Sequence, residues 1–138
     1  MRVWLALCAV AAGLSLAPIV SAQDAAKVDP KHYTVVSENA HVRILKIHYG
    51  AHEKSVMHSH PASVAVFLTD GKGTFTAPDG KKTDFDVKAG TAQYTAAEIH
   101  LPENTTDKPF ELILVELKGK APAKAAAAKP KAAKPAAK

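Results

Sequence analysis

Short runs of β-branched and aromatic residues alternate with turn-forming residues through the middle of the chain. Between residues 33 and 118, no segment of helical length shows the apolar periodicity of an amphipathic helix. The runs predict strands over residues 33–36, 42–49, 64–69, 74–77, 83–87, 91–95 and 110–118. Residues 70–73 (Asp-Gly-Lys-Gly) and 78–80 (Pro-Asp-Gly) are typical of hairpin turns. Many short strands at fairly even spacing predict an all-β sandwich or barrel.

The last predicted strand is apolar on both of its faces. Side chains alternate across a strand, so Phe110 and Leu112 point one way while Ile113 and Val115 point the other. A strand of this kind is covered on both sides. The folded region, of about 85 residues, is also small for a barrel, and such a domain buries only about 60–65% of its unfolded surface. We therefore expect two copies to pair as a homodimer.

The first 22 residues contain the three parts of a secretory signal. Arg2 gives the positively charged start, residues 3–17 form an apolar segment, and residues 20–22 (Val-Ser-Ala) form a small-residue cleavage site. Cleavage after Ala22 would leave Gln23 as the first residue of an exported protein, periplasmic or secreted. The alternative is an uncleaved membrane anchor, because the apolar segment is nearly long enough to span a bilayer. The only cysteine, Cys8, lies in this leader, so a mature chain would have neither a disulfide nor a thiolate nucleophile.

The formal net charge of +5 is concentrated in the C-terminal tail. Residues 23–120 contain 12 basic and 13 acidic side chains, so the folded region is not a basic nucleic-acid-binding domain and no nucleic-acid partner is expected. Residues 121–138 consist of Ala, Lys and Pro and predict a disordered tail, because the prolines interrupt any helix and the lysines repel one another. Two roles stay open for this tail: a solubilising segment, or an electrostatic contact to anionic surfaces of the cell envelope. Residues 23–32 are expected to form an irregular lead-in to the β domain over residues 33–120.

The strongest chemical signal is His58-Ser59-His60. In an extended segment, residues two apart project from the same face, so both imidazoles point to a common place. A third histidine, His100, lies forty residues further on beside a predicted strand. Three imidazoles suit iron, manganese, nickel, copper or zinc, so the spacing predicts a divalent transition metal without naming it.

The segments around these histidines resemble the two signatures of the cupin family. Gly50, His58-Ser59-His60 and Gly71 are similar to the first signature, although the first gap is two residues longer than usual. Residues 90–104, which end in His100 and Asn104, are similar to the second. This resemblance implies a single small cupin-type β-barrel, a jelly-roll-like double-stranded β-helix, with a metal site inside it. The string of motifs is also similar to small, single-domain bacterial cupins.

Two departures from the family pattern change the expected metal site. The family's metal-binding glutamate would fall at Val64, and the proline and glycine of the second signature are replaced by Ala96 and Glu98. The resemblance then implies His58, His60 and His100 as the metal ligands, with no carboxylate among them. About three positions of an octahedral ion would stay open for substrate, oxygen or water. Glu53, Glu98 and Glu103 are candidates to supply a carboxylate from nearby.

Further pocket residues follow from the same strands. Glu98 shares the face of His100 and is a candidate partner of that histidine, a general base or a solvated charge. Gln93 is expected to line the cavity, and Asn104 either binds a ligand or caps a turn. Val64, Val66 and Leu68 are expected to continue the histidine face and to give the cavity an apolar floor, which favours a small apolar or aromatic ligand.

Three functions remain open at this stage. The first is a metal-dependent enzyme, with similarity to dioxygenase-like cupins. The second is a non-catalytic protein of the cell envelope that binds a metal or a small molecule. The third is a structural module in which the histidines bind no metal. No residue of the sequence identifies a catalytic acid or base, so the catalytic residues are not assigned.

Overall fold

A computed structural model of the chain describes residues 23–119. The described chain contains one short helix, α1 (Ala25–Val28). Its nine strands are β1 (Tyr33–Glu38), β2 (Val42–Tyr49), β3 (His58–His60), β4 (Ser63–Phe67), β5 (Gly71–Thr76), β6 (Lys82–Val87), β7 (Ala92–Thr95), β8 (Glu98–Asn104) and β9 (Phe110–Leu117). Within residues 23–119, no helix has the length and apolar character needed to cross a membrane. The predicted signal peptide and lysine-rich tail lie outside the described residues.

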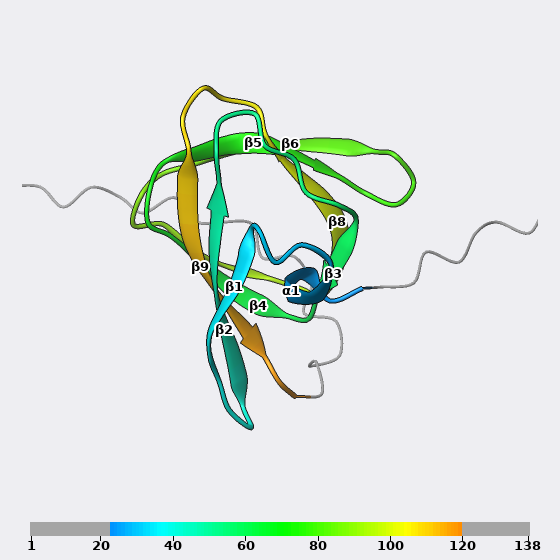
Figure 1. Cartoon of the computed structure of the whole chain (residues 1–138), viewed down its shortest axis with the longest axis vertical. Helices are drawn as coiled ribbons and strands as arrows, with labels where there is room; N and C mark the ends of the chain where they lie inside the picture. The colour runs from blue at the N-terminus through cyan, green and yellow to red at the C-terminus, as the bar shows by residue number, and fades with distance from the viewer. Residues whose placement is uncertain (1–22, 120–138) are drawn as a thin grey trace, which may run out of the picture.

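The strands form two antiparallel sheets that enclose the interior (Figure 1). The five-stranded sheet has the order β1-β2-β9-β4-β7, and the four-stranded sheet has the order β3-β8-β5-β6. The hydrogen bonds of the two sheets do not join into one closed ladder. This arrangement confirms the predicted all-β, jelly-roll-like class. The histidines predicted to bind metal lie on β3 and β8, and the wall opposite them comes from the larger sheet.

The hydrophobic core lies on the inner face of the five-stranded sheet. Leu45 on β2 is opposite Leu114 on β9, and Ile47 is opposite Leu112. These side chains are 0–7% exposed, and Phe67 on β4 packs with them. Burial of a large apolar side chain stabilises a fold by about 1.5–3 kcal/mol, so β2, β9 and β4 hold the sheet together.

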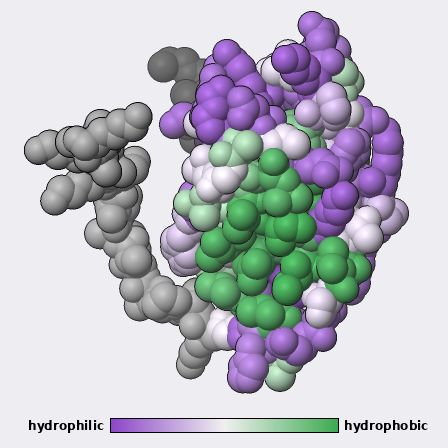
Figure 2. All heavy atoms as spheres, turned by 90° about the vertical axis from the view of Figure 1, so that its left-hand side faces the viewer, coloured by the Kyte–Doolittle hydropathy of each residue, from purple (hydrophilic) through white to green (hydrophobic). Residues whose placement is uncertain are grey.

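The outer face of the same sheet is also apolar where β4 lies beside β9. Val64 lies beside Val115, and Val66 lies beside Ile113, in the register of β4 and β9. Tyr94 on the edge strand β7 is opposite Val64 and is 52% exposed. Figure 2 shows hydrophobic residues gathered into one continuous area on the side of the molecule where β9 lies. Antiparallel sheets that face water on one side normally carry polar residues there, so this outer face has the composition of a covered surface.

All seven predicted strands are present, and the differences in their bounds have local causes. Residues 42–49 form a strand as predicted, and residues 78–80 form the predicted turn, in which Gly80 has a φ of 82°. Residues 71–73, expected in a turn, instead begin β5. A side chain at Gly73 would lie 2.1 Å from the carbonyl oxygen of Glu103, so this glycine allows β5 and β8 to approach closely. The expected irregular lead-in contains α1, whose N-cap Asp24 accepts a hydrogen bond from the backbone N–H of Ala26.

Candidate metal centre

Two neighbouring strands bring the three predicted histidines together. On the antiparallel pair β3 and β8, His58 is directly opposite His100, and His60 lies two residues further along the same face as His58. The ring centroids are 4.8 Å apart for His58 and His60, 5.0 Å for His58 and His100, and 5.5 Å for His60 and His100. One nitrogen from each ring lies within 4.8 Å of the other two. All three side chains are buried, with at most 8% exposure.

Hydrogen bonds fix which ring nitrogens are available. The Nδ1 atom of His58 lies 2.7 Å from the carbonyl oxygen of Val56, so it donates its proton there. The Nδ1 atom of His60 lies 2.7 Å from Oε1 of Glu116. In both rings this arrangement leaves Nε2 as the nitrogen with a free lone pair, the form in which imidazole binds a metal.

Two nitrogens of the cluster are buried without a hydrogen bond: Nε2 of His58, and Nδ1 of His100, which lies 3.2 Å from Oε1 of Glu98 without the geometry of a hydrogen bond. No other buried side-chain nitrogen or oxygen of residues 23–119 lacks a partner. An unsatisfied buried polar atom is costly, and a native protein normally has a ligand, an ion or a water for it. The donor set and its unsatisfied atoms therefore fit a transition metal ion held by neutral imidazoles.

The electrostatics of the cluster favour a neutral His58. Burial, reinforced by the neighbouring His60, lowers the pKa of His58 to about 4, so its imidazole is uncharged at neutral pH. Burial raises the pKa of Glu116, but the hydrogen bonds from His60 and Arg43 outweigh this effect and keep the pKa below its ordinary value. Glu116 is thus a carboxylate behind the cluster.

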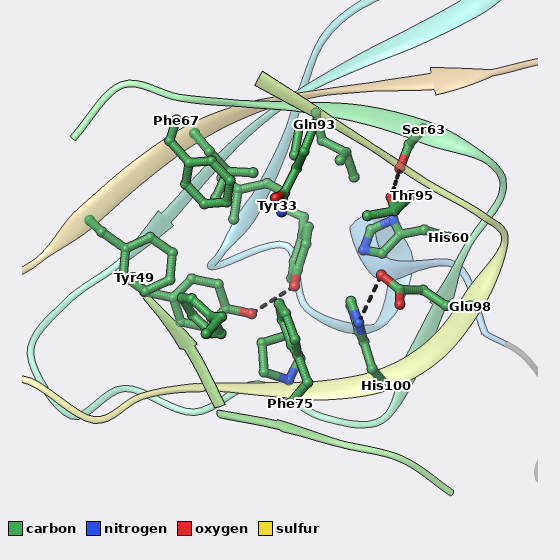
Figure 3. Close-up of a pocket in the computed structure, with 17 residues that line it drawn as sticks. Tyr33, Tyr49, His60, Ser63, Phe67, Phe75, Gln93, Thr95, Glu98 and His100 are labelled. Carbon is green, nitrogen blue, oxygen red and sulfur yellow. Dashed lines mark hydrogen bonds and ion pairs between the residues drawn. The ribbon is translucent and has the colours of Figure 1, made fainter. Parts of the chain in front are cut away.

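Glu98 is the acidic side chain that lies at the cavity beside the histidines. Its Oε1 atom is 3.2 Å from Nδ1 of His100 (Figure 3). Burial raises the pKa of Glu98, but the nearby His100 lowers it more, so the group is ionised at neutral pH. The other two carboxylate candidates lie elsewhere. Glu53 binds Lys31, His32 and the backbone of Gly50, and Glu103 pairs with Lys54.

A cavity of about 110 Å³ extends from the histidines into the space between the sheets (Figure 3). His60, Ser63, Gln93, Thr95, Glu98 and His100 give it polar groups. Its remaining wall is apolar or aromatic and consists of Tyr33, Ile47, Tyr49, Ala65, Phe67, Phe75, Phe85, Pro102, Phe110, Leu112 and Leu114. The Phe75 ring stacks on His100 at a centroid distance of 4.8 Å and an angle of 3°, so an aromatic side chain fixes the plane of that imidazole.

The expected cavity floor is wrong by one residue. Val64 and Val66 do not line the cavity, and Leu68 is 48% exposed; Ser63, Ala65 and Phe67 line it instead. The cause is the break at residues 61–62, where the chain leaves β3 in one sheet and enters β4 in the other. The alternation of faces does not continue across such a break. The cavity remains apolar, because Ala65 and Phe67 replace the expected valines.

The remaining predicted pocket residues separate into two groups. Gln93 and Glu98 line the cavity as expected. Asn104 does not: its amide donates to the carbonyl oxygens of Gly50 and Lys108, and its Oδ1 accepts from Thr106. Its role is to hold the loop after β8, which is the turn-capping alternative predicted for it.

Sequence reasoning missed several residues of the site, and three of them are Tyr33, Tyr49 and Glu116. The hydroxyl groups of Tyr33 and Tyr49 lie 2.7 Å apart at the cavity wall, and the Tyr33 ring is 4.7 Å from that of His58. Nothing in their local sequence separates them from ordinary core tyrosines. The third, Glu116, carried a usable signal, because it is the one charged residue at an inward position of β9, after Phe110, Leu112 and Leu114.

Fold and site together define a small β domain with a three-histidine cluster in its interior. Residues 44–116 match the family model described as the cupin domain. The chain belongs to the cupin family. No curated protein matches it.

Several solved structures share the fold. A cupin domain from Bordetella pertussis Tohama I has 21% sequence identity and a TM-score of 0.59, with 63% of this chain and 92% of that chain covered. A conserved protein with a double-stranded β-helix domain from Klebsiella pneumoniae has 22% identity and a TM-score of 0.52, covering 65% and 78%. An RmlC-like cupin family protein from Methanocaldococcus jannaschii has 20% identity and a TM-score of 0.50, covering 62% and 77%. At these identities the likeness shows the fold alone.

Proposed function

We propose that this chain is an exported single-domain cupin that binds a divalent transition metal ion through His58, His60 and His100. Iron, manganese, nickel, copper and zinc are the candidate ions. The observation that carries the proposal is Nε2 of His58, a fully buried ring nitrogen in the cluster that has no hydrogen-bond partner. An ion shared by the three rings would satisfy this atom and would use each imidazole in its neutral form.

The cavity supports a small apolar or aromatic ligand beside this ion. Four phenylalanines and two tyrosines line it, and its volume of about 110 Å³ is on the scale of one aromatic ring. The aromatic wall would bind the ring and exclude water. The polar groups lie next to the histidines, so a polar substituent of the ligand would face the metal.

The enzymatic form of this proposal is dioxygenase-like. A bound transition ion would supply Lewis acidity or activation of O₂. The protein's own residues would orient the ligand with Gln93 and the Tyr33–Tyr49 hydroxyl pair, and a carboxylate oxygen of Glu98 would accept a proton from the ligand. In a dioxygenase reaction both atoms of O₂ enter the organic substrate.

The alternative is a non-catalytic protein that binds the metal or a small molecule. The position of Glu98 favours it, because this acidic side chain of the cavity wall has a carboxylate oxygen 3.2 Å from a ring nitrogen of His100. A carboxylate held beside an imidazole is less available as a general base for a ligand. This alternative predicts ligand binding without turnover.

Elemental mass spectrometry on the purified full chain tests the metal site. We expect about one transition metal ion per chain, lost in the double variant His58→Ala/His60→Ala and kept in the control His41→Ala, which replaces an exposed histidine outside the cluster. Metal retained in the double variant would contradict the assignment. Oxygen consumption by the loaded protein with a panel of phenols and benzoates then separates the two functions, since only the enzyme consumes O₂ in a substrate-dependent way.

Export and the role of the tail are proposed from sequence alone. Export to the periplasm or the medium is supported by the three-part leader, and N-terminal sequencing that begins at Gln23 would establish cleavage. Contact of the tail with anionic envelope surfaces is supported by its five lysines. Binding to anionic vesicles that is weakened by salt, and lost when these lysines are replaced by glutamine, would establish it.

A further inference from the structure

Glu116 is an ionised side chain with 1% exposure, on an inward position of the central strand β9. Its two oxygens have different partners. Oε1 lies 2.7 Å from Nδ1 of His60, and Oε2 lies 2.5 Å from Nε of Arg43 on β2. A buried carboxylate is tolerated only when it is paired and hydrogen-bonded, and Glu116 satisfies both conditions.

Arg43 connects this carboxylate to the segment before the β domain. Its Nη1 atom donates to Oδ2 of Asp24 at 2.6 Å. Asp24 is also the N-cap of α1, and its other carboxylate oxygen accepts from the backbone N–H of Ala26. A continuous chain of hydrogen bonds thus runs from Asp24 through Arg43 and Glu116 to His60.

The same segment contacts the histidine strand at Ser59 and the loop before this strand at Ser55. The carbonyl oxygen of Gln23 accepts hydrogen bonds from the backbone N–H of Ser59 at 2.7 Å and from its hydroxyl at 3.1 Å. Ser59 lies between the two histidines of β3. Asp29 accepts from the hydroxyl of Ser55 at 2.5 Å, and that hydroxyl is 3.4 Å from Nδ1 of His58. Residues 23–32 therefore support both histidines, although they precede the matched cupin domain at 44–116.

We propose that Asp24, Arg43 and Glu116 form a positioning relay for His60, which makes metal affinity depend on a segment outside the matched cupin domain. Glu116 accepts the proton of Nδ1, so the Nε2 lone pair of His60 points into the cluster. A carboxylate behind a ligating imidazole fixes its tautomer and raises its basicity, and loss of such a partner weakens metal binding by about 10–100-fold. The proposal rests on the proposed metal-binding function.

The test uses conservative variants of the full chain. Glu116→Gln keeps the shape of the side chain but removes its charge. Asp24→Asn keeps a good N-cap and removes only the charge that faces Arg43. The matched control is Glu111→Gln, on the same strand, where Glu111 pairs at the surface with Lys46 and His48 and does not touch the cluster.

We expect Co²⁺ and Zn²⁺ competition titrations to give affinity losses of about 10–100-fold for Glu116→Gln, a smaller loss in the same direction for Asp24→Asn, and no change for Glu111→Gln. Nitrogen-15 NMR of the metal-free protein should show His60 protonated on Nδ1, with this preference reduced in Glu116→Gln. Metal affinity within twofold of the unmodified protein in Glu116→Gln would overturn the relay while leaving the metal site intact.

Failure of the relay and failure of the metal proposal give different results. If the unmodified chain binds no metal, the proposed function fails, and the tautomer of His60 still decides the relay. An unchanged tautomer in Glu116→Gln would then overturn it. If Glu116→Gln does not fold, Asp24→Asn decides by the same two measurements, and unchanged metal affinity in that variant would refute the dependence on residues 23–32.

Discussion

Metal-free protein should lose stability in a defined pH window because of His58. Burial and the neighbouring His60 lower the pKa of His58 from 6.5 to about 4 in the folded state. Between these two pH values the imidazole is protonated in the unfolded chain and neutral in the folded chain. The contribution of His58 to the free energy of unfolding is therefore fully present above pH 6.5. It decreases as the pH falls below 6.5 and decreases no further below pH 4. A difference of this size corresponds to about 3 kcal/mol, and the side chain has 0% exposure, so little of it is screened.

Urea unfolding with a chelator present, at pH 7 and pH 4, measures this effect against the variant His58→Gln. Other groups also titrate in this range, because the pKa values of Asp24, Asp29 and Glu116 are lowered in the folded state, where the opposing effect of burial is outweighed by hydrogen bonds. These groups remain in the variant, so the difference between the two proteins isolates His58. We expect the free energy of unfolding of the unmodified protein, relative to that of the variant, to be about 3 kcal/mol lower at pH 4 than at pH 7. Parallel losses in both proteins would refute the reasoning.

Three further predictions follow from the site and the sheets. Zn²⁺ at about 100 times its dissociation constant should raise the free energy of unfolding by about 2.7 kcal/mol. Ca²⁺ at the same concentration should have no such effect, and His60→Ala should abolish the effect of Zn²⁺. Thermal unfolding measures all three outcomes. Gly73→Ala should destabilise the fold by about 2 kcal/mol, since a side chain there would meet a backbone oxygen 2.1 Å away, and denaturant unfolding checks this value. The apolar area formed by Val64, Val66, Ile113 and Val115 predicts a homodimer in solution, because two copies of this area can face each other without opposing like charges. Light scattering should find a dimer that Val66→Lys makes monomeric and that Thr34→Lys, an exposed position on β1, leaves intact.

The sequence is informative where residue type alone determines the structure. β2 follows a clear apolar alternation and matches its predicted bounds, and the spacing of His58 and His60 placed both on one face. β3 has three residues, too few for a periodic signal, and β8 contains Pro102 and Asn104, which are typical of turns. Both histidine-bearing strands were therefore missing from the predicted set. Their pairing comes from contacts between segments forty residues apart, which a local pattern does not encode.

The cavity floor shows a second limit of sequence reasoning. Face alternation holds along a strand, but residues 61–62 carry the chain from one sheet to the other and reset it. Continued alternation from His60 would place Val64 at the cavity, but Val64 lies on the outer face beside Val115. For Glu116, in contrast, the sequence pattern is informative. A charged residue at an inward position of a strand is rarely buried without a partner, so the pattern indicates a buried partner even though it does not identify it.

The carboxylates near the cluster are placed differently from the metal-binding glutamate of the family pattern, whose position is Val64 in this chain. Neither Val64 nor the inward-facing Ala65 can supply a negative ligand, and the two ionised carboxylates nearest the cluster act on imidazoles: Glu116 on His60 and Glu98 on His100. The negative charge is thus placed behind and beside the nitrogen ligands. Oxygen ligands with negative charge are what Ca²⁺ and Mg²⁺ require, while imidazoles suit the transition metals. A cluster of three imidazoles, two of which lie beside carboxylates, should therefore select transition metals by its donor atoms and regain, through more basic imidazoles, part of the affinity that a glutamate ligand would have given.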